Sequence, residues 1–376
     1  MMNQKNTRKA QSQAGFSLIE LLVYMAILGL LMTLVMISFT QTMRRSGQQS
    51  SIAETTIEAS IGLGMLRIDL EHAGFGLPWE WQDDGNMSYT EPEPFSGDSD
   101  EVPRALSSEN LSNGSLNRAD YLVVRGTNVA RGEASQRWGY VGRDGLRNIQ
   151  LRAIGEGGFT ATDRLLVIRP QTETGELRQL LMDGDDYFFT TGTIHKVAPE
   201  PSTIDPDGAK FLVYGFNDDA DISRPFNRVD YFVSAANVPT QCAPNTGVLG
   251  KRQINQADGG GVFMPIVDCV ADFQIVYYMD TDGDGGWDEA FNADNISGLS
   301  AAQVRDQVKA IRCFILTHEG AFDTGYTHPN NEITVGDTIN NKSVGRTFDL
   351  AERIKGNWAN YRWKVHSVTV SPKNFH

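Results

Sequence analysis

The stretch from Leu21 to Phe39 is almost wholly apolar and contains no charged residue. An α-helix rises about 1.5 Å per residue, so a run of this length can cross a hydrocarbon core of about 30 Å. The pattern therefore predicts a transmembrane helix over residues 16–43.

Beyond this run the apolar residues recur at helical spacing, which predicts an amphipathic continuation of the helix over residues 44–76. The face expected to pack on a globular domain consists of Ile52, Ile57, Ile61, Met65 and Ile68. Gly47, Gly62 and Gly64 each lower helix propensity by about 1 kcal/mol relative to Ala, so we expect bends or local melting there. The Gly- and Pro-rich residues 73–78 predict the helix end.

Short apolar or alternating runs bounded by turn residues predict β-strands in the rest of the chain. No long helical pattern alternates with these runs, which favours antiparallel over parallel sheet. We therefore expect an α+β fold, in which a long N-terminal helix packs on the mostly antiparallel sheet of a globular domain over residues 77–376. The predicted strands are 121–124, 165–168, 211–216, 229–233, 273–278, 310–316 and 363–370.

Two polar segments interrupt this pattern, at about residues 79–117 and 199–207. Both are rich in acidic residues, Ser, Gly or Pro and lack an apolar period. They are therefore predicted to be acidic loops.

The charge balance limits the classes of partner. Asp and Glu number 47 against 33 Lys and Arg, which gives a net charge of −14. Phosphate binding needs clustered cations, so no nucleic acid partner is expected. The sequence contains no short histidine metal motif, phosphate-binding loop or nucleophile elbow, so no enzymatic activity is expected.

The residues before the apolar run form a short basic leader. Residues 1–15 contain Lys5, Arg8 and Lys9 but no acidic side chain, so they can stay on the cytoplasmic side of a membrane. No small-residue cleavage site follows the apolar run, as an ordinary secretory signal requires. An uncleaved signal anchor is an alternative, but it leaves Glu20 unexplained at the helix entrance, where a carboxylate costs about 2.5–3.5 kcal/mol.

The sequence GFSLIELL at residues 15–22 resembles the processing site of type IV prepilins and type II secretion pseudopilins. The resemblance implies that prepilin peptidase cleaves after Gly15 and that the new N-terminal residue, Phe16, is N-methylated. It also implies that the helix is kept as the filament core, where Glu20 pairs with the terminal amine of a neighbouring subunit.

Residues 66–76, 270–285 and 361–366 are similar to recurrent segments of the PilW-type minor pilins. This resemblance implies a low-abundance pilin that takes part in pilus assembly initiation or in the tip complex. Its partners would be other minor pilins, the major pilin, the inner-membrane assembly platform and a possible tip adhesin. The chain would be a single-pass inner-membrane protein with a periplasmic C-terminal domain before assembly, and part of the surface pilus fibre afterwards.

Two other functions share the same architecture and remain open. One is a J-type pseudopilin of a type II secretion system, and the other is a calcium-dependent tip adhesin.

The three cysteines, Cys242, Cys269 and Cys313, show no CxxC spacing. In an oxidising periplasm they allow one internal disulfide. We predict the pair Cys242–Cys269, because both lie beside turn sequence, whereas Cys313 lies within an apolar strand and is expected to pack as a small hydrophobe. Pairings that involve Cys313 remain alternatives.

The segment 280–291 predicts a Ca²⁺ site directly after a strand, because its acidic residues alternate as ligands do in an EF-hand loop. The candidate ligands are Asp280, Asp282, Asp284, the Gly286 carbonyl, Asp288 and Glu289. Phe291 stands where the EF-hand pattern requires a bidentate glutamate, and Glu289 could replace that ligand. The alternative is a solvated acidic hairpin turn, because Asp and Gly are also common turn formers.

Overall fold

The computed structural model describes residues 15, 17–81, 87, 89–96, 102–110, 115–129, 132–144, 146–154, 157–171, 177–200, 209–218, 221–339 and 341–375. The chain forms two compact units, Met1–Ile52 and Ala53–His376. The predicted leader up to residue 14, the predicted methylation residue Phe16 and residues 201–207 of the second acidic loop lie outside the described residues.

A single helix, α1 (Leu18–Glu71), continues from the first unit into the second. In the first unit its large apolar side chains from Leu18 to Phe39 are exposed, and the helix is long and apolar enough to cross a membrane. The helix continues through Gly47, Gly62 and Gly64, so the predicted local melting is absent. It ends at Glu71 and residues 72–76 form turns, so the predicted end at residue 76 was too late.

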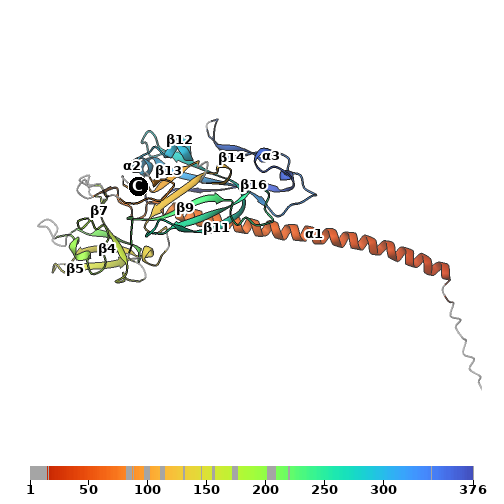
Figure 1. Ribbon diagram of the computed structural model, residues 1–376, viewed down its shortest axis with the longest axis horizontal. Coiled ribbons are helices and arrows are strands. Elements are labelled where there is room, and N and C mark those ends of the chain that lie inside the picture. Colours follow the sequence, from red (N-terminus) through yellow and green to blue (C-terminus); the bar gives the residue numbers. More distant parts are fainter. Residues whose placement is uncertain are drawn as a thin grey trace, which may run out of the picture. The chain divides into compact units, whose positions relative to one another are not determined.

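The described residues of the second unit form three sheets (Figure 1). The largest has, in spatial order, β16 (Arg362–Val370), β13 (Val308–Glu319), β11 (Gly261–Met279), β10 (Gly247–Ile254), β9 (Asn227–Ser234), β3 (Tyr121–Gly126) and β2 (Leu106–Glu109), and β12 (Glu289–Asn292) also pairs with β11. A six-stranded sheet has the order β1 (Glu80–Trp81), β7 (Gln179–Leu180), β6 (Arg164–Arg169), β8 (Phe211–Asn217), β4 (Trp138–Arg143) and β5 (Ile149–Ile154). The third is a hairpin of β14 (Glu332–Ile339) and β15 (Lys342–Asp349).

The strand pairs are antiparallel except for β1 with β7, which pair in parallel. Each of the seven predicted strands lies within an observed strand. The prediction of an α+β fold with a mostly antiparallel sheet is therefore confirmed.

The remaining helices are short and lie in connections between strands. They are α2 (Ala301–Gln307), α3 (Leu350–Arg353) and the 3-10 turns η3 (Leu116–Arg118), η4 (Ala134–Gln136), η5 (Ile194–Lys196), η6 (Ala293–Ile296) and η7 (Trp358–Asn360).

The prediction of one continuous loop over residues 79–117 was wrong in part. This span contributes β1 to one sheet and β2 to another, and Leu106 in β2 is fully buried. Polar residues in β2 concealed the strand from the hydrophobic pattern, although Ser107 and Ser108 are buried as well.

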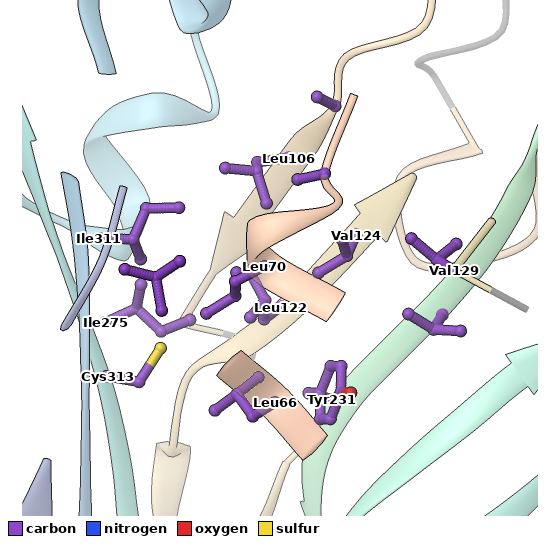
Figure 2. Close-up of a cluster of buried hydrophobic side chains, with 14 of the residues drawn as sticks. Leu66, Leu70, Leu106, Leu122, Val124, Val129, Tyr231, Ile275, Ile311 and Cys313 are labelled. Carbon is purple, nitrogen blue, oxygen red and sulfur yellow. The ribbon is translucent and has the colours of Figure 1, made fainter. Parts of the chain in front are cut away.

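The face of α1 that packs on the globular domain also differs from the prediction. Ile57 and Ile61 are each 61% exposed. The buried positions of the second half of the helix are instead Ala59, Gly62, Leu66, Asp69 and Leu70. Small residues on this face let the helix backbone approach the sheet closely, and Figure 2 shows the side chains of Leu66 and Leu70 beside Leu122 of β3.

The largest sheet is covered on both faces, which explains the continuous apolar sequence of β11. Phe273, Ile275 and Tyr277 belong to the core that includes α1, whereas Val276 and Tyr278 belong to a second core with residues of β14, β15 and α3. Alternate side chains of a strand point to opposite faces of the sheet, so the two faces of β11 pack into two separate cores.

Candidate functional sites

The N-terminal motif places a carboxylate at the start of α1. The Ser17 N–H donates to Glu20 Oε2 over 3.1 Å, and the Ile19 N–H donates to Ser17 Oγ over 3.3 Å. Gly15 is exposed, and a Cβ added there would meet no atom within 4 Å. The Glu20 carboxylate thus satisfies an amide that the first turn of a helix leaves without a partner.

The predicted calcium loop forms the connection between β11 and β12. Carboxylate oxygens of Asp280, Asp282 and Asp284 lie within 4.8 Å of one another. Gly283 and Gly285 have φ angles of +80° and +94°, in the left-handed region that favours glycine. The loop thus brings together three of the predicted ligands.

The Asp280 carboxylate already has partners within the loop. Its Oδ1 accepts from the Gly283 N–H over 2.6 Å, and its Oδ2 accepts from the Gly285 N–H over 2.9 Å. Lys309 Nζ lies 3.3 Å from Oδ2. Burial acts to raise the pKa of Asp280, but these hydrogen bonds and the Lys309 charge outweigh it and lower the pKa. Asp280 is therefore ionised at neutral pH, and any cation in the loop competes with Lys309.

The other two predicted carboxylate ligands, Asp288 and Glu289, do not belong to the cluster of Asp280, Asp282 and Asp284. The Asp288 carboxylate accepts from the Thr281 hydroxyl over 2.8 Å, and this hydrogen bond is the main cause of its lowered pKa. Glu289 is exposed and is paired through its backbone with Met279 in the β11–β12 ladder. Asp288 therefore stabilises the hairpin, and the described contacts give Glu289 no place beside the three clustered carboxylates.

The predicted disulfide between Cys242 and Cys269 is present, with a Cα–Cα distance of 4.9 Å. The third cysteine, Cys313, is free and fully buried in β13, as predicted, and burial raises the pKa of its thiol. The thiolate is the reactive form of cysteine, so Cys313 is a structural residue rather than a reactive one.

A buried histidine lies beside the disulfide. His318 Nε2 accepts from the Ala243 N–H over 2.9 Å, and its Nδ1 donates to the Gly320 carbonyl over 3.0 Å. These two bonds require the neutral ring, and burial lowers the pKa of His318 to about 4. His318 joins the end of β13 to the disulfide loop and is not available as a metal ligand while these bonds persist.

Two features were missed by reasoning from the sequence. Asp69 is buried in the last turns of α1 and forms an ion pair with Lys251 of β10. Trp287, in the loop between β11 and β12, is 48% exposed and lines a groove together with residues of four strands. The signal for the first was the helical spacing of Ala59, Gly62 and Leu66, which continues to Asp69. The second depends on contacts between distant strands.

Two family models match the chain. The prokaryotic N-terminal methylation motif matches residues 10–36, which include Gly15, Phe16 and Glu20. The model described as Type IV Pilus-assembly protein W matches residues 230–374, from β9 to beyond β16. No curated protein and no solved structure matches the chain. Both family matches agree with the resemblances predicted from the sequence, and they indicate a structural rather than an enzymatic protein.

Proposed function

Because the two family matches support a type IV minor pilin of the PilW type, we propose that the chain acts in small numbers in pilus assembly initiation or in the tip complex. The observation that carries this proposal is that one chain combines the methylation motif, a long apolar helix and the PilW domain. Its partners would be prepilin peptidase, other minor pilins, the major pilin and the inner-membrane assembly platform.

In this proposal, prepilin peptidase removes residues 1–15 and Phe16 becomes the methylated N-terminus. The exposure of Gly15 supports access by a peptidase. The globular domain would lie in the periplasm before assembly and on the pilus fibre afterwards. The basic leader supports this orientation, because basic residues favour the cytoplasmic side.

Glu20 would guide assembly through its charge. Cleavage creates a cationic amine on Phe16, and a carboxylate in an apolar helix bundle is stabilised by an opposite charge. The hydrogen bond from the Ser17 N–H holds this carboxylate at the helix N-terminus, where the amine of a neighbouring subunit would arrive.

Gene deletion and complementation test this function. Deletion should remove surface fibres, and the unaltered chain should restore them. A Glu20→Ala chain should still be processed but should restore few fibres, whereas Glu54→Ala, which removes an exposed acid farther along α1, should restore them fully. Intact fibres with loss of secreted enzymes would instead indicate a J-type pseudopilin, and intact fibres with loss of adhesion would indicate a tip adhesin.

We further propose that the loop of Asp280, Asp282 and Asp284 binds Ca²⁺. Three carboxylates within 4.8 Å repel one another, and a hard cation with oxygen ligands would relieve this repulsion. The glycines at 283 and 285 support a tight loop of the kind that such sites use. The ligand set would be these three carboxylates with backbone carbonyls, including that of Gly286, and water.

A further inference from the structure

A groove lies on the face of the largest sheet that packs against the β14–β15 hairpin, between the sheet and this hairpin. It has a volume of about 460 Å³ and includes Tyr278 of β11, Trp287 of the loop between β11 and β12, Arg312 of β13, Asp337 and Thr338 of β14, and Thr369 of β16. We call it the Trp287 groove. The residues come from four strands and one loop, so the groove is a property of the folded domain.

The exposure of Trp287 is unusual within this protein. All six tryptophans are among the described residues, and Trp287 alone is exposed, at 48%. Its ring contacts the ring of Tyr278 at a centroid distance of 5.1 Å and an interplanar angle of 71°. An exposed large aromatic side chain beside polar groups is typical of a binding site, because it supplies contact area with little loss of conformational entropy.

The polar groups in the groove are held in place by the scaffold. Asp337 Oδ2 accepts from Arg312 Nη1 over 2.7 Å and from the Tyr278 hydroxyl over 2.9 Å. Arg312 and Asp337 nevertheless remain 34% and 31% exposed in their side chains. The pair thus offers donors and acceptors to a ligand without having to reorganise, and Thr338 and Thr369 add hydroxyl groups.

This combination matches the chemistry of a sugar ring. A pyranose presents a C–H face that packs on an aromatic ring, and hydroxyl groups at its edge that donate and accept hydrogen bonds. A carboxylate beside a guanidinium serves both roles for neighbouring hydroxyls. We propose that the Trp287 groove binds a neutral saccharide, with the ring face on Trp287 and the hydroxyls on Arg312 and Asp337.

The surrounding charge favours a neutral ligand over an anionic one. The exposed residues Asp282 and Asp284 lie in the same loop as Trp287, and like charges in proximity disfavour an anion. Sialylated or uronic acid sugars and nucleotides, whose bases also stack on tryptophan, are therefore expected to bind less well. This proposal does not depend on the pilin function, because the groove lies wholly within the globular unit.

The full chain can be tested in a detergent that has no sugar headgroup. Fluorotryptophan labelling gives one fluorine NMR signal per tryptophan, and Trp287→Phe assigns the signal of Trp287. The probes are a printed array of neutral and acidic oligosaccharides, followed by titration of the best neutral binder, all in buffer without calcium so that Asp282 and Asp284 keep their charge. The expected result is a saturable shift of the Trp287 signal and weakening of affinity by about tenfold or more in Trp287→Ala.

The controls separate a binding role from a structural one. Phe322→Ala removes an exposed aromatic side chain outside the groove and should leave the affinity unchanged. Asp337→Asn keeps an acceptor for Tyr278 but removes the charge, and should also weaken binding while the chain stays folded. The proposal is overturned if no neutral saccharide on the array binds, or if binding persists unchanged in Trp287→Ala.

Discussion

Gly62 of α1 lies directly against the backbone of Ile266 in β11. A Cβ added at Gly62 would lie 2.5 Å from the Ile266 carbonyl oxygen and 2.6 Å from Val267 Cγ2. The glycine is therefore required by close packing between the helix and the sheet, and the helix remains unbroken through it.

This packing predicts opposite effects for two neighbouring glycines. Gly62→Ala should destabilise the chain by about 1–3 kcal/mol, because the added methyl group forces the helix and β11 apart. Gly64→Ala, where no atom lies within 4 Å of an added Cβ, should stabilise it by about 0.5–1 kcal/mol through helix propensity. Denaturant unfolding of both variants measures the difference. Shifts of the same sign would show that Gly62 does not pack in this way.

The buried ion pair between Asp69 and Lys251 predicts a non-additive mutant cycle. The two groups are 2% and 5% exposed in their side chains, and Asp69 also accepts from the Tyr231 hydroxyl. Lys251→Met should cost about 3–5 kcal/mol of unfolding free energy, because it leaves a buried carboxylate without its cation. The double variant Asp69→Leu, Lys251→Met should be more stable than Lys251→Met alone. If the losses of unfolding free energy in Asp69→Leu and Lys251→Met simply add up to the loss in the double variant, the two residues do not form a direct pair.

His318 predicts a loss of stability on acidification. Burial disfavours the imidazolium and lowers the pKa of His318 from its ordinary value of about 6.5 to about 4 in the folded chain. A base with a lowered folded pKa contributes its stability above the unfolded pKa and loses it as pH falls. The loss should therefore occur between about pH 6.5 and pH 4 and approach about 3 kcal/mol.

The control for this effect is His318→Gln, which can keep one donor and one acceptor but does not titrate. The unfolding free energy of this variant should change less with pH over the same interval. An equal pH dependence in both chains would assign the acid sensitivity to other groups.

The calcium proposal predicts a thermal shift. After treatment with chelator, added Ca²⁺ should raise the melting temperature of the chain, since an ion that binds only the folded state stabilises it by mass action. Asp282→Ala, Asp284→Ala should abolish the shift. The matched control Glu133→Ala, Glu200→Ala removes the same charge from side chains that are 91% and 80% exposed, and should keep the shift. If calorimetry detects no calcium binding to the unaltered chain, the loop is only a turn.

The sequence predicted the strands of the core because their apolar runs are buried on one or both faces and are bounded by turn residues. It failed where a long-range partner decides the outcome. The large isoleucines at 57 and 61 outweighed the small residues in the sequence pattern, but close approach to β11 favours Ala59 and Gly62. The prediction missed β10 because this strand contains the polar residue Lys251. The burial of Lys251 depends on an ion pair with Asp69, which lies far away in the sequence.

The candidate sites divide in the same way. The Asp280 cluster and the Cys242–Cys269 pair were predicted from local sequence, and the structure brings both sets of residues together. The Trp287 groove was not predicted, because Arg312 and Asp337 meet Trp287 only when separate strands assemble.

The N-terminus of the chain recovered from sheared surface fibres tests the proposed function most directly. Mass spectrometry should find this chain at a low ratio to the major pilin, with N-methylated Phe16 as its first residue. A chain that is absent from the fibres and remains in the inner membrane with residues 1–15 attached would contradict the proposal.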